Sequence, residues 1–347
     1  MKLSRRALIK GSASVFGWAR LASAQDHDPL PSWNPGPAKR AIVDFVRATT
    51  NKGGAEFVPV EDRIATFDQD GTTWVERPIY SQVLFAFARL AAIAPQHPQW
   101  KKTQPFQAVL DHDKAAMEKF TPKDLEPIIM ATHSGLSVEA FQKAVRDWMA
   151  TARHPRFNRP YPEMVYQPML ELMRYLRANQ YRTYLVTGGG QDFVRAYARQ
   201  VYGIPPDQVI GSALETRYTY NGNGQGMLIL EPKLLLNNNF SGKAEDIYLF
   251  VGKHPRAAFG NSTGDRQMLE YTQAGGGLRL MQLVLHDDAQ REYAYGPAQG
   301  LPGTTIGTFT QELYDEAKAR DWTVISMKND WRTIFGAPGR PPVAPSL

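Results

Sequence analysis

Residues 67–74 read FDQDGTTW and follow the largely apolar run RIAT at residues 63–66. Asp68 and Asp70 therefore stand one residue apart where a buried strand is expected to end, and a glycine and two threonines come next. Two carboxylates this close repel each other, and burying either of them costs free energy. We therefore expect a positive charge beside this acidic pair.

Strands and helices alternate along the second half of the chain. Strands are predicted at residues 181–186, 256–260 and 278–285, separated by helical patterns, and Asn-Gly turn residues predict a β-hairpin over residues 216–230. This alternation is typical of a parallel sheet covered by helices on both faces. The predicted fold class is α/β, with a Rossmann-like parallel sheet core, a helical cap inserted after the first strand and a small β-hairpin.

The inserted segment is predicted to be a helical insertion. Three stretches between residues 80 and 150 show helical spacing of apolar residues, with no strand between them. We therefore divide the chain into an α/β core at residues 25–79 and 160–347 and a helical cap at residues 80–159. The Pro-rich residues 25–38 are expected to form a surface arm.

Residues 1–24 have the pattern of a cleaved export signal. They hold five basic side chains and no acidic one, followed by a short apolar stretch and the small-residue exit Ala22-Ser23-Ala24. The stretch SRRALIK resembles a twin-arginine signal, and an ordinary basic secretory signal is the alternative. We expect export to a periplasm by the twin-arginine machinery, cleavage near Ala24, and no stable membrane anchor afterwards.

Composition excludes several classes of function. The formal net charge is +6, and the five bases of the signal leave the rest of the chain nearly neutral, with no basic stripe that would indicate nucleic-acid binding. There are no cysteines, which excludes disulfides, thiolate nucleophiles and zinc–thiolate sites. Hydrophobic residues make up 43% of the 347, as expected of a folded, enzyme-sized protein.

Polar residues follow each predicted strand, and a lysine opens a helix between two of them. In open α/β sheets, ligands bind beyond the carboxyl ends of the strands. Carboxylates, an amide, a hydroxyl and an ammonium group suit an oxygen-ligated divalent cation and an anionic substrate. The residues are Asp68, Asp70, Thr187, Lys243, Asn261, Asp265, His286, Asp287 and Asp288.

Four of these stretches, in this order, resemble the motifs of the haloacid dehalogenase superfamily. They are DQDGT at residues 68–72, TGG at residues 187–189, the helix-opening Lys243 and GNSTGD at residues 260–265. The long helical insertion after the first motif is similar to that of the phosphoserine phosphatase-like branch, which has a helical cap. Lys253 also follows a glycine, but it lies too close to Asn261 for a helix and a strand to intervene.

The resemblance implies a role for each matching residue. Asp68 would be the nucleophile that forms an aspartyl-phosphate, and Asp70 would protonate the leaving alcohol and then activate water. Thr187, Lys243 and main-chain N–H groups would bind the phosphoryl oxygens. An acid at position 70 indicates that the substrate is a phosphate ester. The halide that leaves in a dehalogenase needs no proton, so dehalogenases lack an acid at this place.

The resemblance also implies a Mg²⁺ cofactor. Asp68, the main-chain carbonyl of Asp70 and Asn261 would hold the ion, with Asp265 nearby. Many relatives have Asp where this chain has Asn261, and a neutral amide is expected to weaken Mg²⁺ binding.

Other residues near the motifs are candidates for substrate binding. Glu76 is interpreted either as a reader of a substrate amine or as an exposed helix-turn acid, and Trp74 either as a cation–π contact or as packing. Arg156 is a possible clamp for an acidic group, with a surface role as the alternative. His133 is interpreted either as a substrate contact carried by the cap or as part of a turn between helices. The substrate-binding candidates are Gly188, Gly189, Glu76, Trp74 and Arg156.

The predicted function is an exported, Mg²⁺-dependent phosphomonoesterase that hydrolyses a small organic phosphate. Two alternatives remain open at this stage: phosphoryl transfer to an alcohol, and a periplasmic binding protein without turnover. Retention of both Asp68 and Asp70 argues against the binding protein, because ligand binding alone needs no paired nucleophile and acid. The expected partner is a small phosphate ester, not a nucleic acid.

Overall fold

The computed structural model describes residues 28–339, and the expected export signal at residues 1–24 lies outside them. Seven strands form one sheet in the order β4-β3-β2-β1-β5-β6-β7, with every neighbouring pair parallel except β3 and β4. The predicted α/β class is therefore confirmed. The strands are β1 (Ile64–Phe67), β2 (Arg182–Gly190), β3 (Val209–Tyr220), β4 (Gly226–Leu236), β5 (Ala257–Gly260), β6 (Leu280–Leu285) and β7 (Thr323–Ser326).

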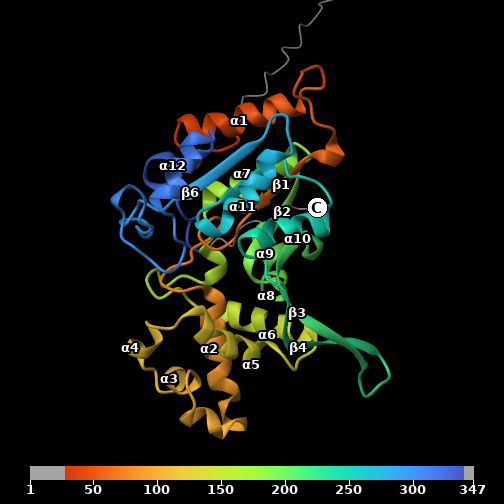
Figure 1. The fold of residues 1–347 in the computed structure, drawn as a ribbon, viewed down its shortest axis with the longest axis vertical. Helices are drawn as coiled ribbons and strands as arrows, with labels where there is room; N and C mark the ends of the chain where they lie inside the picture. The colour runs from red at the N-terminus through yellow and green to blue at the C-terminus, as the bar shows by residue number, and fades with distance from the viewer. Residues whose placement is uncertain (1–27, 340–347) are drawn as a thin grey trace, which may run out of the picture.

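Helices cover both faces of the sheet, as Figure 1 shows. Alternate residues of a strand point to opposite faces, so Phe67 and Leu185 enter one hydrophobic cluster with α1 and α7, while Ile64 and Val186 enter a second with α10, α11 and α12. The helices of the α/β core are α1 (Pro37–Thr50), α7 (Gln167–Ala178), α8 (Gln191–Arg195), α9 (Ala198–Tyr202), α10 (Ser241–Val251), α11 (Arg266–Ala274), α12 (Gln311–Ala319) and α13 (Met327–Asp330).

The segment from α2 to α6, between β1 and α7, folds into a helical cap with its own small core. Ala86, Leu90, Trp100 and Ile128 pack together there, apart from the clusters of the sheet. Figure 1 shows these helices together at one end of the molecule. They are α2 (Ser81–Ile93), α3 (Phe106–Leu110), α4 (Lys114–Met117), α5 (Pro122–His133) and α6 (Val138–Thr151).

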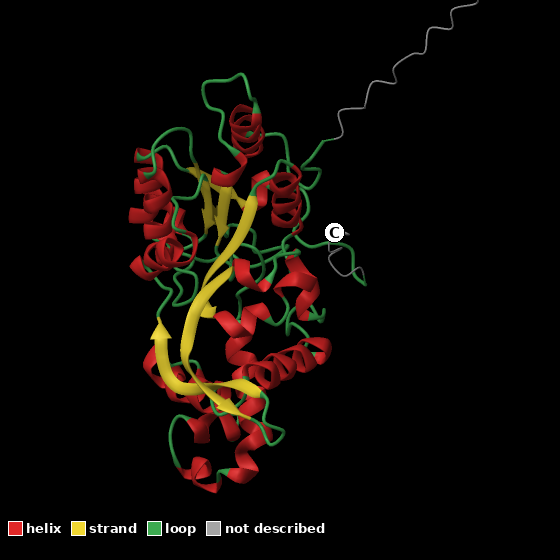
Figure 2. Cartoon of the chain, turned by 90° about the vertical axis from the view of Figure 1, so that its right-hand side faces the viewer, coloured by secondary structure: helices red, strands yellow, loops and turns green. Residues whose placement is uncertain are grey.

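The β-hairpin connects the sheet to the cap. Figure 2 shows β3 and β4 leaving the sheet as a long curved ribbon that runs along the cap helices. Leu230 of β4 exchanges main-chain hydrogen bonds with the cap loop, accepting from Gly135 at 2.8 Å and donating to Leu136 at 2.9 Å. The hairpin therefore holds the cap over the carboxyl ends of the strands.

Two details of the sequence-based expectation are wrong. Residues 25–38 are not a surface arm throughout, because Leu30 and Trp33 are fully buried and the Trp33 indole N–H donates to the carbonyl of Pro168 at 3.0 Å. The apolar spacing of residues 191–203 also predicts one helix, but the structure has two short helices there, α8 and α9. No helix among residues 28–339 combines the length and the apolar character needed to cross a membrane.

Candidate active site

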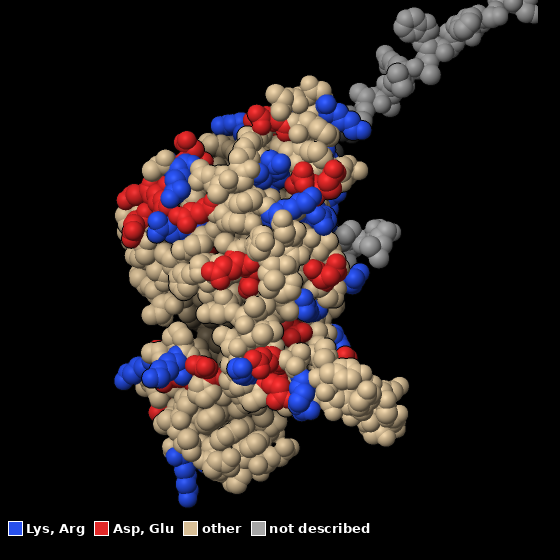
Figure 3. Space-filling model, turned by 45° about the vertical axis from the view of Figure 1, so that its right-hand side comes forward, with Lys and Arg blue, Asp and Glu red and all other residues tan. Residues whose placement is uncertain are grey.

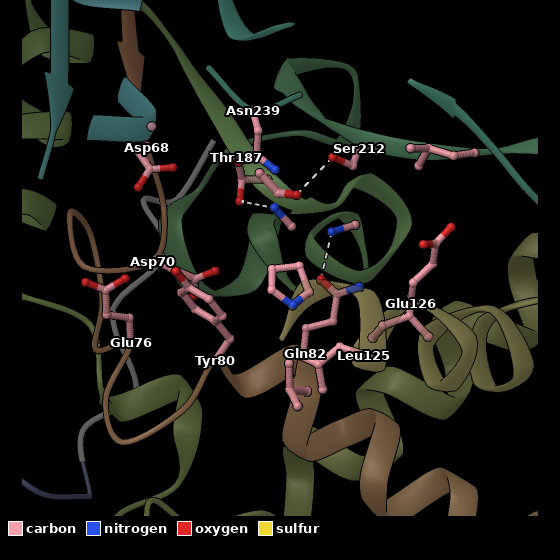
Figure 4. A pocket seen from close by; sticks show the side chains of 18 of the residues that line it. Asp68, Asp70, Glu76, Tyr80, Gln82, Leu125, Glu126, Thr187, Ser212 and Asn239 are labelled. Carbon is pink, nitrogen blue, oxygen red and sulfur yellow. Dashed lines mark hydrogen bonds between the residues drawn. The ribbon is translucent and has the colours of Figure 1, made fainter. Parts of the chain in front are cut away.

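The strand order brings the predicted motifs together. Strands β2 and β5 flank β1 and run parallel to it, so the residues that follow all three lie at one edge of the sheet. The site is buried: Asp68 is 6% exposed, and Thr187, Asn261 and Asp265 are each 1% exposed. Figure 4 shows Asp68, Asp70 and Thr187 facing a common space.

Lys243 provides the positive charge expected beside the acidic residues. Its Nζ lies 2.6 Å from Asp68 Oδ1 and 2.6 Å from Asp265 Oδ1, and it donates to the carbonyl of Val186 at 3.0 Å. Burial alone would lower the pKa of Lys243, but the two carboxylates raise it above its usual value, so the amine stays charged. Burial and the charge of Asp265 together raise the pKa of Asp68 to about 7 despite this lysine.

Asp70 lies in a different environment from Asp68. Its Oδ1 accepts a hydrogen bond from the indole N–H of Trp74 at 2.6 Å, and burial raises its pKa to about 6. A carboxyl group with such a pKa can both donate and accept a proton near neutral pH. Trp74 itself is fully buried against Tyr197 and lies outside the lining of the cavity, so its contact with the site is the bond to Asp70.

Asn261 is held by partners on both ends of its amide. Its Oδ1 accepts from the hydroxyl of Thr72 at 3.0 Å, and its Nδ2 donates to Glu76 Oε1 at 2.8 Å. Glu76 also accepts from the hydroxyl of Tyr295 at 2.7 Å, and it is only 2% exposed, which excludes the exposed helix-turn interpretation. Gly71 is required here, because it has a φ of +80° and a Cβ would overlap the Asn261 amide.

The segment after β6 supports the loop that carries the acidic pair. His286 Nε2 lies 2.7 Å from the carbonyl oxygen of Gly71, and His286 Nδ1 lies 3.2 Å from Glu292 Oε2. Asp287 instead accepts hydrogen bonds from the hydroxyl of Ser326 and the main-chain N–H of Lys328. Asp288 forms an ion pair with Arg291. The HDD stretch therefore supports the fold around the site.

Three further sequence candidates lie in defined places. Arg156 is outside the cavity and donates to the carbonyls of residues 289, 290 and 292. Lys253 forms an exposed pair with Asp62. His133 ends α5, lines the cavity and is 4% exposed, with its Nε2 3.0 Å from Gln82 Nε2.

A cavity of about 500 Å³ opens above Asp68 and Asp70. The sheet edge forms its floor, with Thr187, Gly188 and Gly189, and the cap and the hairpin form its walls. The cap wall comes from α5, which shows a Thr121–Asp124 capping box and a proline in its first turn. Sequence reasoning missed α5 because Pro127 interrupts its helical pattern, and it missed Tyr295 because no motif marks that loop.

The oxygen ligands present fit a hard divalent cation such as Mg²⁺. Asp68 Oδ2 and Asn261 Oδ1 lie close together, because they are 3.5 Å and 3.0 Å from the hydroxyl oxygen of Thr72. The main-chain carbonyl of Asp70 accepts no hydrogen bond from residues 28–339, so its oxygen is available as a ligand. Within that range, no group of three His, Cys, Asp or Glu side chains could hold a metal. An ion here would therefore depend on the amide and the main-chain carbonyl.

The fold and the site define an α/β protein whose carboxylate-centred site lies under a helical cap. The chain belongs to the haloacid dehalogenase-like hydrolase family, whose model matches residues 65–270, more than half of the sequence. The superfamily predicted from the four motifs is thus confirmed. Comparison with curated proteins found no match.

Solved structures resemble the chain at low identity. One is a protein of unknown function from Bordetella pertussis Tohama I (15% identity, 76% of this chain and 97% of that chain, TM-score 0.47). Another, also functionally unknown, is from Anaerococcus prevotii DSM 20548 (15% identity, 72% and 86%, TM-score 0.49). A third is a probable phosphoserine phosphatase from Vibrio cholerae (14% identity, 80% and 63%, TM-score 0.38).

Proposed function

We propose that the chain is a metal-dependent phosphomonoesterase that forms an aspartyl-phosphate, an acyl phosphate, on Asp68. The observation that carries the proposal is the pairing of Asp68, fixed through one oxygen by Lys243, with Asp70, whose pKa is raised to about 6 and which borders the same cavity. A carboxylate nucleophile next to a proton-carrying acid suits cleavage of a phosphate ester with an alcohol leaving group.

The reaction divides into two displacements at phosphorus. A carboxylate oxygen of Asp68 attacks phosphorus, the bond to the alcohol oxygen breaks, and Asp70 gives the alcohol oxygen its proton. Water then attacks phosphorus while Asp70 takes a proton from it, and phosphate leaves with Asp68 restored. Thr187 and main-chain N–H groups at the ends of β1 and β2 orient the phosphoryl oxygens.

A bound Mg²⁺ would neutralise charge between the carboxylates and the phosphoryl group. Asp68, Asn261 and the carbonyl of Asp70 would hold it, and Lys243 keeps Asp265 in place beside them. Asp265 in turn accepts from the main-chain N–H groups of Asn261 and Ser262 at 2.9 Å and 3.0 Å, which fixes the loop that presents the amide. Export to a periplasm through the signal at residues 1–24 is part of the same proposal.

The direct test measures phosphate release from a panel of small phosphomonoesters. We expect release by the wild-type protein with Mg²⁺, and loss of release with a chelator or in Asp68→Asn. Faster loss of the ester when an alcohol is added, without a matching rise in free phosphate, would instead indicate transfer. Binding of esters with no turnover under any metal condition would contradict the proposed function.

A further inference from the structure

The cavity above Asp68 is unevenly charged. Among its lining residues within 28–339, Lys243 is the only Lys or Arg, and Asp68 and Asp265 bind its ammonium group. Asp70 and Glu76 add acidic groups near the floor, and Glu126 adds one on the cap wall. Because Lys243 is bound by two carboxylates, no Lys or Arg among the lining residues is left without an acidic partner.

Arg77 and Arg89 lie outside the lining of the cavity and hydrogen-bond to groups that do not line it. Arg77 donates to Thr304 Oγ1 at 3.0 Å, and its guanidinium lies 5.5 Å from the centre of the Tyr295 ring. Arg89 donates to the carbonyl of Thr132 at 2.7 Å. Neither arginine lines the cavity, so an anion entering it away from Asp68 would meet no Lys or Arg side chain among the lining residues.

Apart from Glu126, the wall of the cavity farthest from Asp68 is largely apolar. Figure 4 places Leu125 and Glu126 on the side of the cavity away from Asp68. Apolar side chains here can bury the organic part of a ligand, and a volume of about 500 Å³ is within the range of small-molecule sites. The apolar residues are Val83, Leu125, Ile129 and Met130 from the cap, and Leu214 and Leu234 from the hairpin.

We infer that the site selects phosphate monoesters whose leaving alcohol is apolar or cationic and carries no second anionic group. This inference rests on the proposed phosphomonoesterase function. A carboxylate or second phosphate on the alcohol would lose its water without gaining a cation, and on the cap wall it would face the carboxylate of Glu126. The charge pattern thus rejects phosphorylated hydroxy acids and bisphosphates.

Three phenyl phosphates test this inference, with 4-ethyl, 4-(aminomethyl) and 4-(carboxymethyl) groups. The methylene spacer keeps the phenol leaving groups similar, so kcat/KM with Mg²⁺ reports the charge on the substituent. We expect kcat/KM of the carboxymethyl ester to be at least about tenfold below that of the ethyl ester. The kcat/KM of the aminomethyl ester should equal or exceed that of the ethyl ester. Equal values for the carboxymethyl and ethyl esters would overturn the inference and leave the phosphatase intact. Release from none of the three would overturn the proposed function, and this inference with it.

Charge reversal at the cap wall provides the second arm of the test. Glu126→Lys places a cation on the wall at an exposed position that tolerates substitution, and Glu118→Lys makes the same reversal at an exposed cap position outside the lining. Glu126→Lys should raise kcat/KM of the carboxymethyl ester relative to the ethyl ester by at least about threefold. Glu118→Lys should leave that ratio unchanged. The same ratio change in both variants would show a general charge effect and contradict the assigned wall.

Discussion

Lys243 is the residue that compensates the buried charges of Asp68 and Asp265. Replacing it by Met would leave Asp68 and Asp265 buried without their cation, which costs about 3–5 kcal/mol for pairs of this kind. We therefore expect Lys243→Met to lose about that much free energy of unfolding in urea at pH 7. Because Lys253 pairs with Asp62 at the surface, Lys253→Met should cost at most about 1 kcal/mol. Similar losses in both variants would contradict the assigned burial.

Asp70 is expected to matter most when the leaving group is a poor one. An alkyl alcohol needs a proton as its bond to phosphorus breaks, whereas 4-nitrophenolate leaves without one. Asp70→Asn should therefore lower kcat/KM for an alkyl phosphate by about 10²–10⁴-fold and for 4-nitrophenyl phosphate by much less. Steady-state kinetics on the two esters measures the difference. Equal losses on both would rule out Asp70 as the acid.

The pairing of Asn261 with Glu76 explains why this chain has an amide at that position. In Asn261→Asp a second carboxylate would replace the amide nitrogen now 2.8 Å from Glu76 Oε1, and two buried acids there repel. We expect this variant without metal to lose about 1–3 kcal/mol of unfolding free energy, and Glu76→Gln to restore most of it. A double-mutant cycle by urea unfolding in chelator tests this. Additive losses would show that the two residues act independently.

At the scale of elements, α5 and the end of β2 are joined through Gln82. Gly190 N–H donates to Gln82 Oε1 at 2.7 Å, and Gln82 contacts His133 at the end of α5. Burial, with a smaller contribution from Arg89, lowers the pKa of His133 to about 3. The cap therefore meets the turn at residues 187–190 through a neutral histidine.

This histidine makes stability depend on pH. In the unfolded chain His133 binds a proton below about pH 6.5, whereas in the folded chain it binds one only near pH 3. The free energy of unfolding therefore falls as the pH drops from about 6.5 to about 3. Between pH 7 and pH 5 the contribution is about 2 kcal/mol. Urea unfolding of His133→Gln at the two pH values should show a smaller fall than the wild type by about that amount. Parallel falls would mean that His133 is accessible to water when folded.

The sheet and the acidic floor of the cavity could be predicted because both depend on local patterns. The strand β1 and the acids of residues 68–70 are adjacent in the chain, and parallel strands end at one edge. The roles of Glu76 and Trp74 were left open, because the first depends on Tyr295, more than 200 residues away, and the second on the buried position of its ring. Arg156 was offered as a substrate clamp because its partners, carbonyls of a remote loop, leave no trace in the sequence.

At the scale of the whole molecule, the site depends on parts that are far apart in the chain. Residues of the sheet, the cap, the hairpin and the loop around Thr305 all line one cavity. Figure 3 shows Lys and Arg interspersed with Asp and Glu over the displayed face, so charge is not concentrated in one patch there. Selectivity in this account therefore comes from the interior of the cavity.

The most direct test of the central claim is to trap the phosphoryl group on Asp68. The protein is mixed with Mg²⁺ and a phosphomonoester that it hydrolyses, quenched in acid within milliseconds, digested and analysed by mass spectrometry. We expect a phosphorylated peptide containing Asp68, absent from Asp68→Asn and from a sample quenched before substrate is added. Phosphate release by the wild type with the phosphoryl group on another residue, or on none at any quench time, would contradict it.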